Sequence, residues 1–268
     1  MQRVCRGLLW ALMGTVAGLL PLVAMADTPK MGIVIMHGKG GSPNKFVDEL
    51  AGELKKKGYE VANLEMPWSG NRDYDVDTTA ADAEIDKAIA SLRAAGAQKI
   101  FVSGHSQGGA YALHYGATHE IDGVAAIVPG GNPDSRLFRE KLGASVRKAK
   151  KLVAAGKGDE KVNLQDYEGS RGANTIRTTP NIYLTWFSSD SAMNYRNAVR
   201  HMSKKMPVLW VESTRDYPGL RKYNLEVVDE LPRNALNQLV EPEADHLGAP
   251  TASIDIVADW TAKVATAK

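Results

Sequence analysis

The residues that first suggest chemistry lie in the segment KIFVSGHSQGGAYALHYG, where Ser106 stands between Gly104 and Gly108 in the pattern G-x-S-x-G. An apolar stretch precedes the pattern and a helix-forming stretch follows it. In that setting the pattern presents a serine on a sharp turn between a strand and a helix, and the two glycines leave room for the chain to pass itself. We therefore expect Ser106 to be a nucleophile that attacks an acyl carbonyl.

A serine hydroxyl is a weak nucleophile, so it needs a histidine to accept its proton and an acid to orient that histidine. His246 lies in PEADHLGAP and Asp216 in STRDYP, each just after an apolar, strand-like stretch. The chain order serine, acid, histidine is one in which such triads occur. We expect His246 to be the base and Asp216 the acid, with Glu212 as the rival acid.

The alternative interpretation of G-x-S-x-G is an ordinary tight turn, because short motifs also occur by chance. The other histidines near the motif and in the middle of the chain fit packing or surface positions: His105, His114, His119 and His201. Neither H-E-x-x-H nor another metal-ligand spacing is present in the sequence. We expect no metal and no cofactor.

Acyl transfer also needs donors directed at the developing oxyanion. The segment HGKGGS at 37–42 is a glycine-rich turn in which few side chains block access to backbone N–H groups. We assign the donors to the backbone N–H groups of Lys39 and Gln107, and expect the Lys39 side chain to face solvent. A phosphate-binding loop is the competing interpretation, but its G-x-x-x-x-G-K-[ST] pattern is not formed, since Gly40 follows Lys39.

These candidates must be positioned by the elements around them. Short apolar stretches alternate with amphipathic helical ones, which predicts strands at 32–36, 59–64, 99–103, 123–128, 207–212 and 235–240, and helices at 45–57, 79–95, from 107, and at 251–263. Such alternation requires crossover connections and gives an α/β fold with a mostly parallel, doubly wound sheet. Ligands bind beyond the carboxyl ends of such strands, which is where all three candidates of the triad fall.

The motifs HGKGGS, GHSQGG, STRD and DH resemble those of the α/β-hydrolase superfamily, over nearly all of 31–265. The resemblance implies the α/β-hydrolase fold and a Ser-His-Asp hydrolase of esterase, lipase or peptidase type. The superfamily also contains thioesterases, C–C bond hydrolases and non-catalytic members, so the fold leaves the substrate open. Because the first strand follows so early, we expect a sheet of about six strands without the family's two amino-terminal strands.

The resemblance also implies that the long segment between the fourth and fifth predicted strands is a helical cap, at 132–205. Basic residues exceed acidic ones by eight in this segment. Apolar residues at helical spacing predict one amphipathic helix with a basic outer face: Phe138, Leu142, Val146, Ala149 and Val153. That face could steer an anionic substrate, make weak contact with an anionic envelope surface, or simply keep the helix solvated. Tyr183, Trp186 and Phe187 are candidates for an acyl pocket or for anchoring the insertion.

Residues 1–26 have the features of an export signal: a basic start at Arg3 and Arg6, an apolar stretch, and the small residues Ala24 and Ala26 at a cleavage site. We expect cleavage near Ala26 and a secreted or periplasmic domain at 27–268. An uncleaved membrane anchor is the alternative, because the apolar stretch is slightly long. Cleavage would remove the only cysteine, so no disulfide is expected.

Charge argues against a nucleic-acid partner. The two arginines are the only charged residues of 1–26, so the 33 basic and 31 acidic residues of the whole chain leave equal numbers after cleavage. We expect a small-molecule acyl substrate and hydrolysis of a carboxylic ester through an acyl-enzyme. The alternatives are a thioesterase or peptidase of the same fold, or a non-catalytic envelope protein that binds a ligand or partner.

Overall fold

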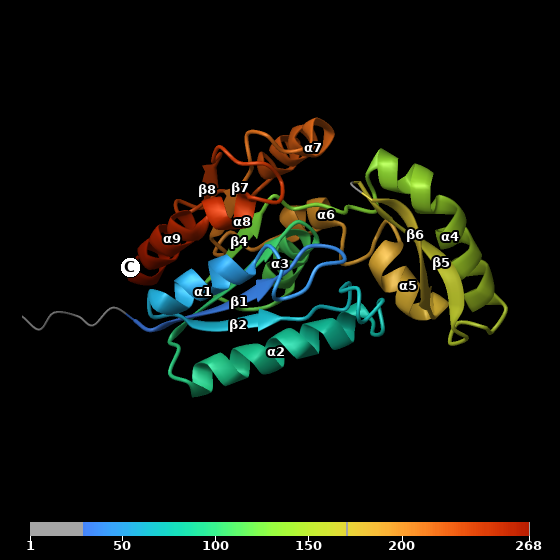
Figure 1. The fold of residues 1–268 in the computed structure, drawn as a ribbon, viewed down its shortest axis with the longest axis horizontal. Helices are drawn as coiled ribbons and strands as arrows, with labels where there is room; N and C mark the ends of the chain where they lie inside the picture. The colour runs from blue at the N-terminus through green and yellow to red at the C-terminus, as the bar shows by residue number, and fades with distance from the viewer. Residues whose placement is uncertain (1–28, 170, 268) are drawn as a thin grey trace, which may run out of the picture.

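The computed structural model describes residues 29–169 and 171–267; the predicted export signal lies outside them. Six strands form one parallel sheet in the order β2-β1-β3-β4-β7-β8 (Figure 1). They are β1 (Met31–Met36), β2 (Glu60–Leu64), β3 (Lys99–His105), β4 (Gly123–Ile127), β7 (Val208–Val211) and β8 (Gln238–Val240). The predicted doubly wound parallel sheet is confirmed.

Helices cover both faces of this sheet, so its central strands β1, β3 and β4 are buried along nearly their whole length. On one face, Ile33 and Ile35 belong to a core formed with α1 (Asp48–Lys56) and α9 (Ile254–Thr266). On the other face, Val34 and Met36 belong to a core formed with three helices: α2 (Thr78–Ala94), α3 (Gln107–Thr118) and α6 (Tyr195–His201). The sheet is thereby held rigid between two apolar layers.

Some element boundaries differ from the prediction. The first helix begins at Asp48 rather than Lys45, because the chain before it turns through a left-handed Phe46 with φ 67°. The last helix is divided into α8 (Ala249–Ala252) and α9. Helix α7 (Pro218–Val228) was not predicted, because its first residues, Pro218 and Gly219, read as a turn although proline is compatible with a first helical position.

Between β4 and β7 the chain forms a separate lobe, at the right of Figure 1, toward which the arrows of β1 and β2 point. It contains α4 (Arg136–Ala154), β5 (Val162–Glu168), β6 (Gly172–Thr178) and α5 (Pro180–Phe187). The prediction of a helical cap is thus incomplete, since β5 and β6 pair as an antiparallel hairpin. Leu164 and Asp166 are the buried positions of β5. Because one of them is a carboxylate, the sequence lacks the alternation of apolar and polar residues that predicts a strand.

No helix in the described ranges is both long enough and apolar enough to cross a membrane.

The turn between β3 and α3 is packed backbone against backbone. A Cβ atom on Gly104 would lie 2.2 Å from the carbonyl carbon of Gly108, and one on Gly108 would lie 2.3 Å from the carbonyl oxygen of Met36. Since the atoms that a Cβ would overlap belong to the backbone, no side-chain rotation can relieve the overlap. The two glycines that flank Ser106 are therefore required by packing.

We predict that Gly108→Ala lowers the free energy of unfolding by about 3 kcal/mol or more, because overpacking against backbone cannot relax. Urea denaturation followed by circular dichroism measures this. Gly52→Ala is the matched control, since a Cβ there meets nothing within 4 Å on helix α1, and it should stabilise by about 0.5–1 kcal/mol. Equal stability of Gly108→Ala and wild type would contradict the packing argument.

Candidate active site

Ser106 occupies the turn between β3 and α3 in a conformation that few non-glycine residues adopt, with φ 55° and ψ −115°. Backbone hydrogen bonds on both sides hold it there: its N–H donates to the Ile127 carbonyl at 2.9 Å, and its carbonyl accepts from the Gly130 N–H at 3.0 Å. Strand β4 therefore supports the strained turn from the side. The hydroxyl is presented to the cavity described below.

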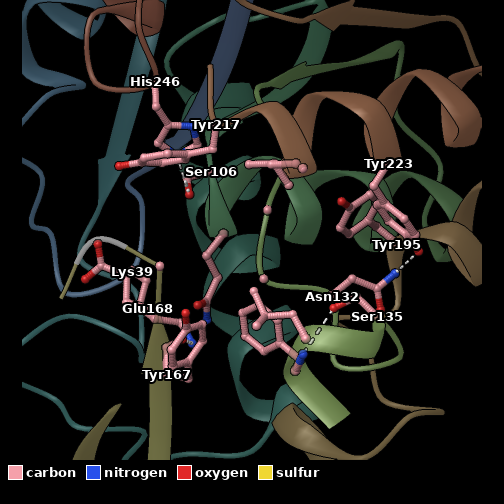
Figure 2. Close-up of a pocket in the computed structure, with 18 of the residues that line it drawn as sticks. Lys39, Ser106, Asn132, Ser135, Tyr167, Glu168, Tyr195, Tyr217, Tyr223 and His246 are labelled. Atoms are coloured by element: carbon pink, nitrogen blue, oxygen red, sulfur yellow. Dashed lines mark hydrogen bonds between the residues drawn. The ribbon is translucent and has the colours of Figure 1, made fainter. Parts of the chain in front are cut away.

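The structure brings Ser106, His246 and Asp216 together. Ser106 Oγ lies 3.0 Å from His246 Nε2 (Figure 2). His246 Nδ1 lies 2.9 Å from both carboxylate oxygens of Asp216. With the proton on Nδ1, the imidazole donates to the carboxylate and Nε2 is free to accept the serine proton. Asp216 is 5% exposed, so its carboxylate is shielded from water.

Strand pairing sets the spacing between the acid and the base. The parallel ladder of β7 and β8 continues past the strand ends as a bridge between Arg215 and Asp245, with the Arg215 N–H donating to Ala244 O at 3.1 Å. Asp216 and His246 are the residues immediately after this bridge. Two side chains 30 residues apart are thus brought into contact by the sheet itself.

The glycine-rich turn at 37–42 and the start of α3 line the same cavity as Ser106. Within 29–169 and 171–267, no protein acceptor is bound to the backbone N–H of Lys39, whereas Gly40 N–H donates to Trp68 O and Gly41 N–H to Gly38 O. Gln107 is the first residue of α3, so its N–H has no intrahelical acceptor. Both predicted donors are therefore available, and the Gln107 N–H lies at the N-terminus of α3, which favours negative charge.

The Lys39 side chain does not face solvent, so that expectation is wrong. Its side chain is 10% exposed, and its ammonium group pairs with Asp166 of the hairpin and donates to Tyr167 O at 3.1 Å. A charged group so far from water needs a partner, and the insertion supplies one.

The cavity in front of Ser106 has a volume of about 550 Å³. Figure 2 shows its lining side chains coming from both the sheet edge and the insertion. Its walls are mainly apolar and aromatic: Leu137, Phe138, Tyr167, Tyr195, Tyr217, Leu220, Tyr223 and Leu247. Tyr183, Trp186 and Phe187 are not among them; they are buried beneath the hairpin and anchor the insertion. In the described part of the chain, no group of three or more His, Cys, Asp or Glu side chains could hold a metal ion.

Residues 33–263 match the family model described as "Alpha/beta hydrolase family". The chain belongs to the alpha/beta hydrolase family. The match identifies the chain as a hydrolase of this family. A search among curated protein sequences gives no match.

Solved structures similar to this alpha/beta hydrolase include a monoacylglycerol lipase from Paleococcus ferrophilus, with 20% identity, coverage of 88% of this chain and 96% of the other, and a TM-score of 0.59. Est1E from Butyrivibrio proteoclasticus with bound ferulic acid has 15% identity, coverage of 88% and 92%, and a TM-score of 0.57. A putative non-heme bromoperoxidase from Mycobacterium tuberculosis has 19% identity, coverage of 89% and 94%, and a TM-score of 0.55. At these identities the likeness concerns the fold alone.

The rival acid of this hydrolase, Glu212, does not contact His246. It is fully buried, and its Oε2 accepts from Asn224 Nδ2 at 2.8 Å and from Trp210 Nε1 at 3.4 Å. Burial, together with the nearby charge of Asp216, raises the pKa of Glu212 to about 7. Glu212 joins the end of β7 to α7 rather than orienting the base.

Sequence reasoning assigned His105 only to packing or surface, and the structure gives it a definite contact. Its Nε2–H donates to the backbone carbonyl of His246 at 2.8 Å. Burial lowers the pKa of His105 to about 3, so the ring stays neutral. Its position beside the serine was the available signal, but a contact between residues 141 positions apart could not be read from it.

We predict that Glu212 makes the stability of this hydrolase fall as pH rises. Its pKa is about 7 in the folded chain against 4.5 as an ordinary glutamate, so between these values the folded state holds a proton that the unfolded state has lost. The free energy of unfolding should decrease across that window, by at most about 3 kcal/mol. Urea denaturation at pH 4.5, 6 and 8 measures it.

Glu212→Gln carries no charge at any of these pH values, so it should remove most of the decline. Glu226→Gln, the same change at an exposed position of α7, should retain it. A decline of equal size in wild type and Glu212→Gln would show that another group titrates.

Proposed function

We propose that this hydrolase is exported and cleaves a carboxylic ester, with Ser106 as nucleophile, His246 as base and Asp216 as orienting acid. The observation that carries the proposal is the continuous hydrogen-bonded series from Ser106 Oγ through His246 to Asp216, with contacts of 3.0 and 2.9 Å. The series opens onto a largely apolar cavity. Such a series is the arrangement that activates a serine for acyl transfer.

In this proposal Ser106 Oγ attacks the ester carbonyl carbon while His246 Nε2 takes the hydroxyl proton. The carbonyl oxygen becomes an oxyanion, which accepts hydrogen bonds from the backbone N–H groups of Lys39 and Gln107. When the intermediate collapses, the C–O bond to the alcohol breaks, and the alcohol leaves with the proton from His246. Water, deprotonated by His246, then attacks the acyl-enzyme, and the acid and Ser106 are released.

The aromatic walls of the cavity support an ester with an apolar acyl or alcohol group. Similar folds named as a monoacylglycerol lipase and as Est1E with bound ferulic acid are consistent with this choice. A thioesterase or peptidase would use the same three residues and differ in the leaving group, which substrate screening distinguishes.

Export is part of the proposal and rests on the pattern of residues 1–26. Weak contact with an anionic envelope surface is supported by the basic face of α4, where Arg147, Lys148 and Lys151 stand on the outside of the lobe. The domain at 27–268 would then act in the periplasm or outside the cell.

We predict that residues 27–268 react with a fluorophosphonate probe at Ser106, because attack by an activated serine on phosphorus expels fluoride. Mass spectrometry of the wild type should locate the adduct there, and Ser106→Ala should not be labelled. Ser106→Ala should also lower kcat for a p-nitrophenyl ester by about 10³-fold or more. A folded wild type without labelling or turnover would favour the non-catalytic binding protein.

We predict that Asp216→Asn lowers kcat by about 10³- to 10⁴-fold, because an amide stabilises the wrong tautomer of the base. Glu212→Gln, the same chemical change four residues earlier, should stay within about threefold of wild type, since Glu212 does not contact His246. Steady-state kinetics on one p-nitrophenyl ester compare them. If Glu212→Gln lowers kcat far more than Asp216→Asn does, Glu212 is the acid.

A further inference from the structure

The two residues proposed as oxyanion donors are also joined through their side chains. Lys39 follows β1 and Gln107 opens α3, yet both side chains are connected to the same carboxylate, Asp166 of hairpin strand β5, Lys39 directly and Gln107 through one other residue. Tyr74 connects Gln107 to that carboxylate. We call Lys39, Gln107, Tyr74 and Asp166 the Asp166 network.

The hydrogen bonds of the network converge on Asp166. Gln107 Nε2–H donates to the Tyr74 hydroxyl at 3.2 Å. That hydroxyl lies 3.3 Å from Asp166 Oδ2 and 3.4 Å from Gln107 Oε1, and it donates to the carboxylate because a charged acceptor forms the stronger hydrogen bond. The other carboxylate oxygen, Oδ1, accepts from the Lys39 ammonium group and from the Tyr167 N–H at 2.7 Å. One carboxylate thus holds both side chains at once.

The network is shielded from water, which strengthens its electrostatic interactions. The Asp166 side chain is 4% exposed, and Tyr74 and Gln107 are also buried. The rings of Phe138 and Phe187 lie 5.5 and 5.3 Å from the Lys39 ammonium group. Burial raises the pKa of the Tyr74 hydroxyl, so it keeps its proton and remains a donor.

The hairpin contacts the glycine-rich turn at a second point. The Arg171 guanidinium lies only 2.7 Å from the position that a Cβ atom on Gly40 would occupy, and Gly40 has φ 61°. Both this contact and the Lys39–Asp166 pair come from the hairpin: Asp166 lies on β5, and Arg171 lies in the turn just before β6. The hairpin therefore contacts two successive residues of the glycine-rich turn, Lys39 and Gly40.

The position of Asp166 is energetically unfavourable for a carboxylate. Asp166 stands on the buried face of β5, beside Leu164, where the alternation calls for an apolar side chain. A buried carboxylate generally lowers stability relative to a well-packed apolar residue, even when it is paired. A role in the site would account for its presence there.

We infer that Asp166 is a positioning residue which, through Lys39 and Tyr74–Gln107, holds the two oxyanion-binding N–H groups in place. This inference rests on the proposed function, because it needs an oxyanion to be formed at Ser106. The insertion then does more than cover the cavity: its hairpin completes the oxyanion hole. The contribution is made in the transition state, where negative charge develops, and not to the binding of the uncharged ester.

The test compares Asp166→Asn and Tyr74→Phe with wild type in the domain at 27–268, using p-nitrophenyl butyrate as substrate. We expect Asp166→Asn to lower kcat by roughly 10- to 100-fold and Tyr74→Phe by roughly 3- to 10-fold, with KM within about threefold. Tyr74→Phe removes only a hydroxyl and keeps the ring that packs on Trp186 and Phe187, so it remains informative if Asp166→Asn does not fold.

A second measurement separates positioning from general damage to the fold. A trifluoromethyl ketone forms a hemiketal with the serine and places an oxyanion at the donors, whereas the matched methyl ketone, which lacks the fluorines, stays an uncharged ketone. Both variants should lose affinity for the trifluoromethyl ketone in proportion to kcat and keep their affinity for the methyl ketone. Ser145→Ala is the matched control: it breaks another hydrogen bond of β5, from Gln165 N–H to the buried Ser145 hydroxyl at 3.0 Å, without touching the network.

Ser145→Ala should therefore lower the melting temperature without changing kcat or the affinity for the trifluoromethyl ketone. If Asp166→Asn and Tyr74→Phe also retain wild-type kcat and affinity for the trifluoromethyl ketone while Ser106→Ala is inactive, the inference is wrong and the proposed function stands. If the variants lose affinity for the trifluoromethyl ketone and for the methyl ketone equally, Asp166 has only a structural role. A wild type that neither turns over the ester nor reacts with a fluorophosphonate overturns both proposals.

Discussion

The arrangement of the site depends on the close contact between backbone atoms where β3 turns into α3. Ser106 can remain at φ 55° only because the surrounding chain leaves it no other conformation, and Gly104 and Gly108 make that contact possible. A strained residue persists when packing over-determines it. Here the strain directs the serine hydroxyl outward and places the first N–H of α3 beside it.

The parallel sheet then determines which side chains can meet the serine. Parallel strands end at one edge, and the ladder between β7 and β8 continues as the Arg215–Asp245 bridge directly before the acid and the base. His105, the last residue of β3, adds a hydrogen bond to the backbone carbonyl of His246. The contacts of the candidate triad are thus fixed mainly by backbone pairing, which is more rigid than side-chain packing alone.

The insertion between β4 and β7 contributes polar contacts as well as walls. Its aromatic and aliphatic side chains enclose the cavity, and its buried carboxylate, Asp166, reaches back to the elements that carry Lys39 and Gln107. A lobe joined to the main domain by a buried ion pair and a tyrosine hydroxyl has a preferred position. The same contacts link cavity shape to the geometry of the proposed oxyanion donors.

The sequence by itself determined the parallel six-stranded sheet and the family, because apolar periodicity and glycine placement are local properties. It also placed Ser106, Asp216 and His246 at strand ends, but could not choose between Asp216 and Glu212, since the choice depends on which carboxylate faces the imidazole. Only the tertiary structure showed the hairpin, the buried Lys39 and the contact made by His105. A carboxylate on an inward strand position hides the strand pattern, and partners as far apart in the chain as Lys39 and Asp166 are identified only when folding brings them together.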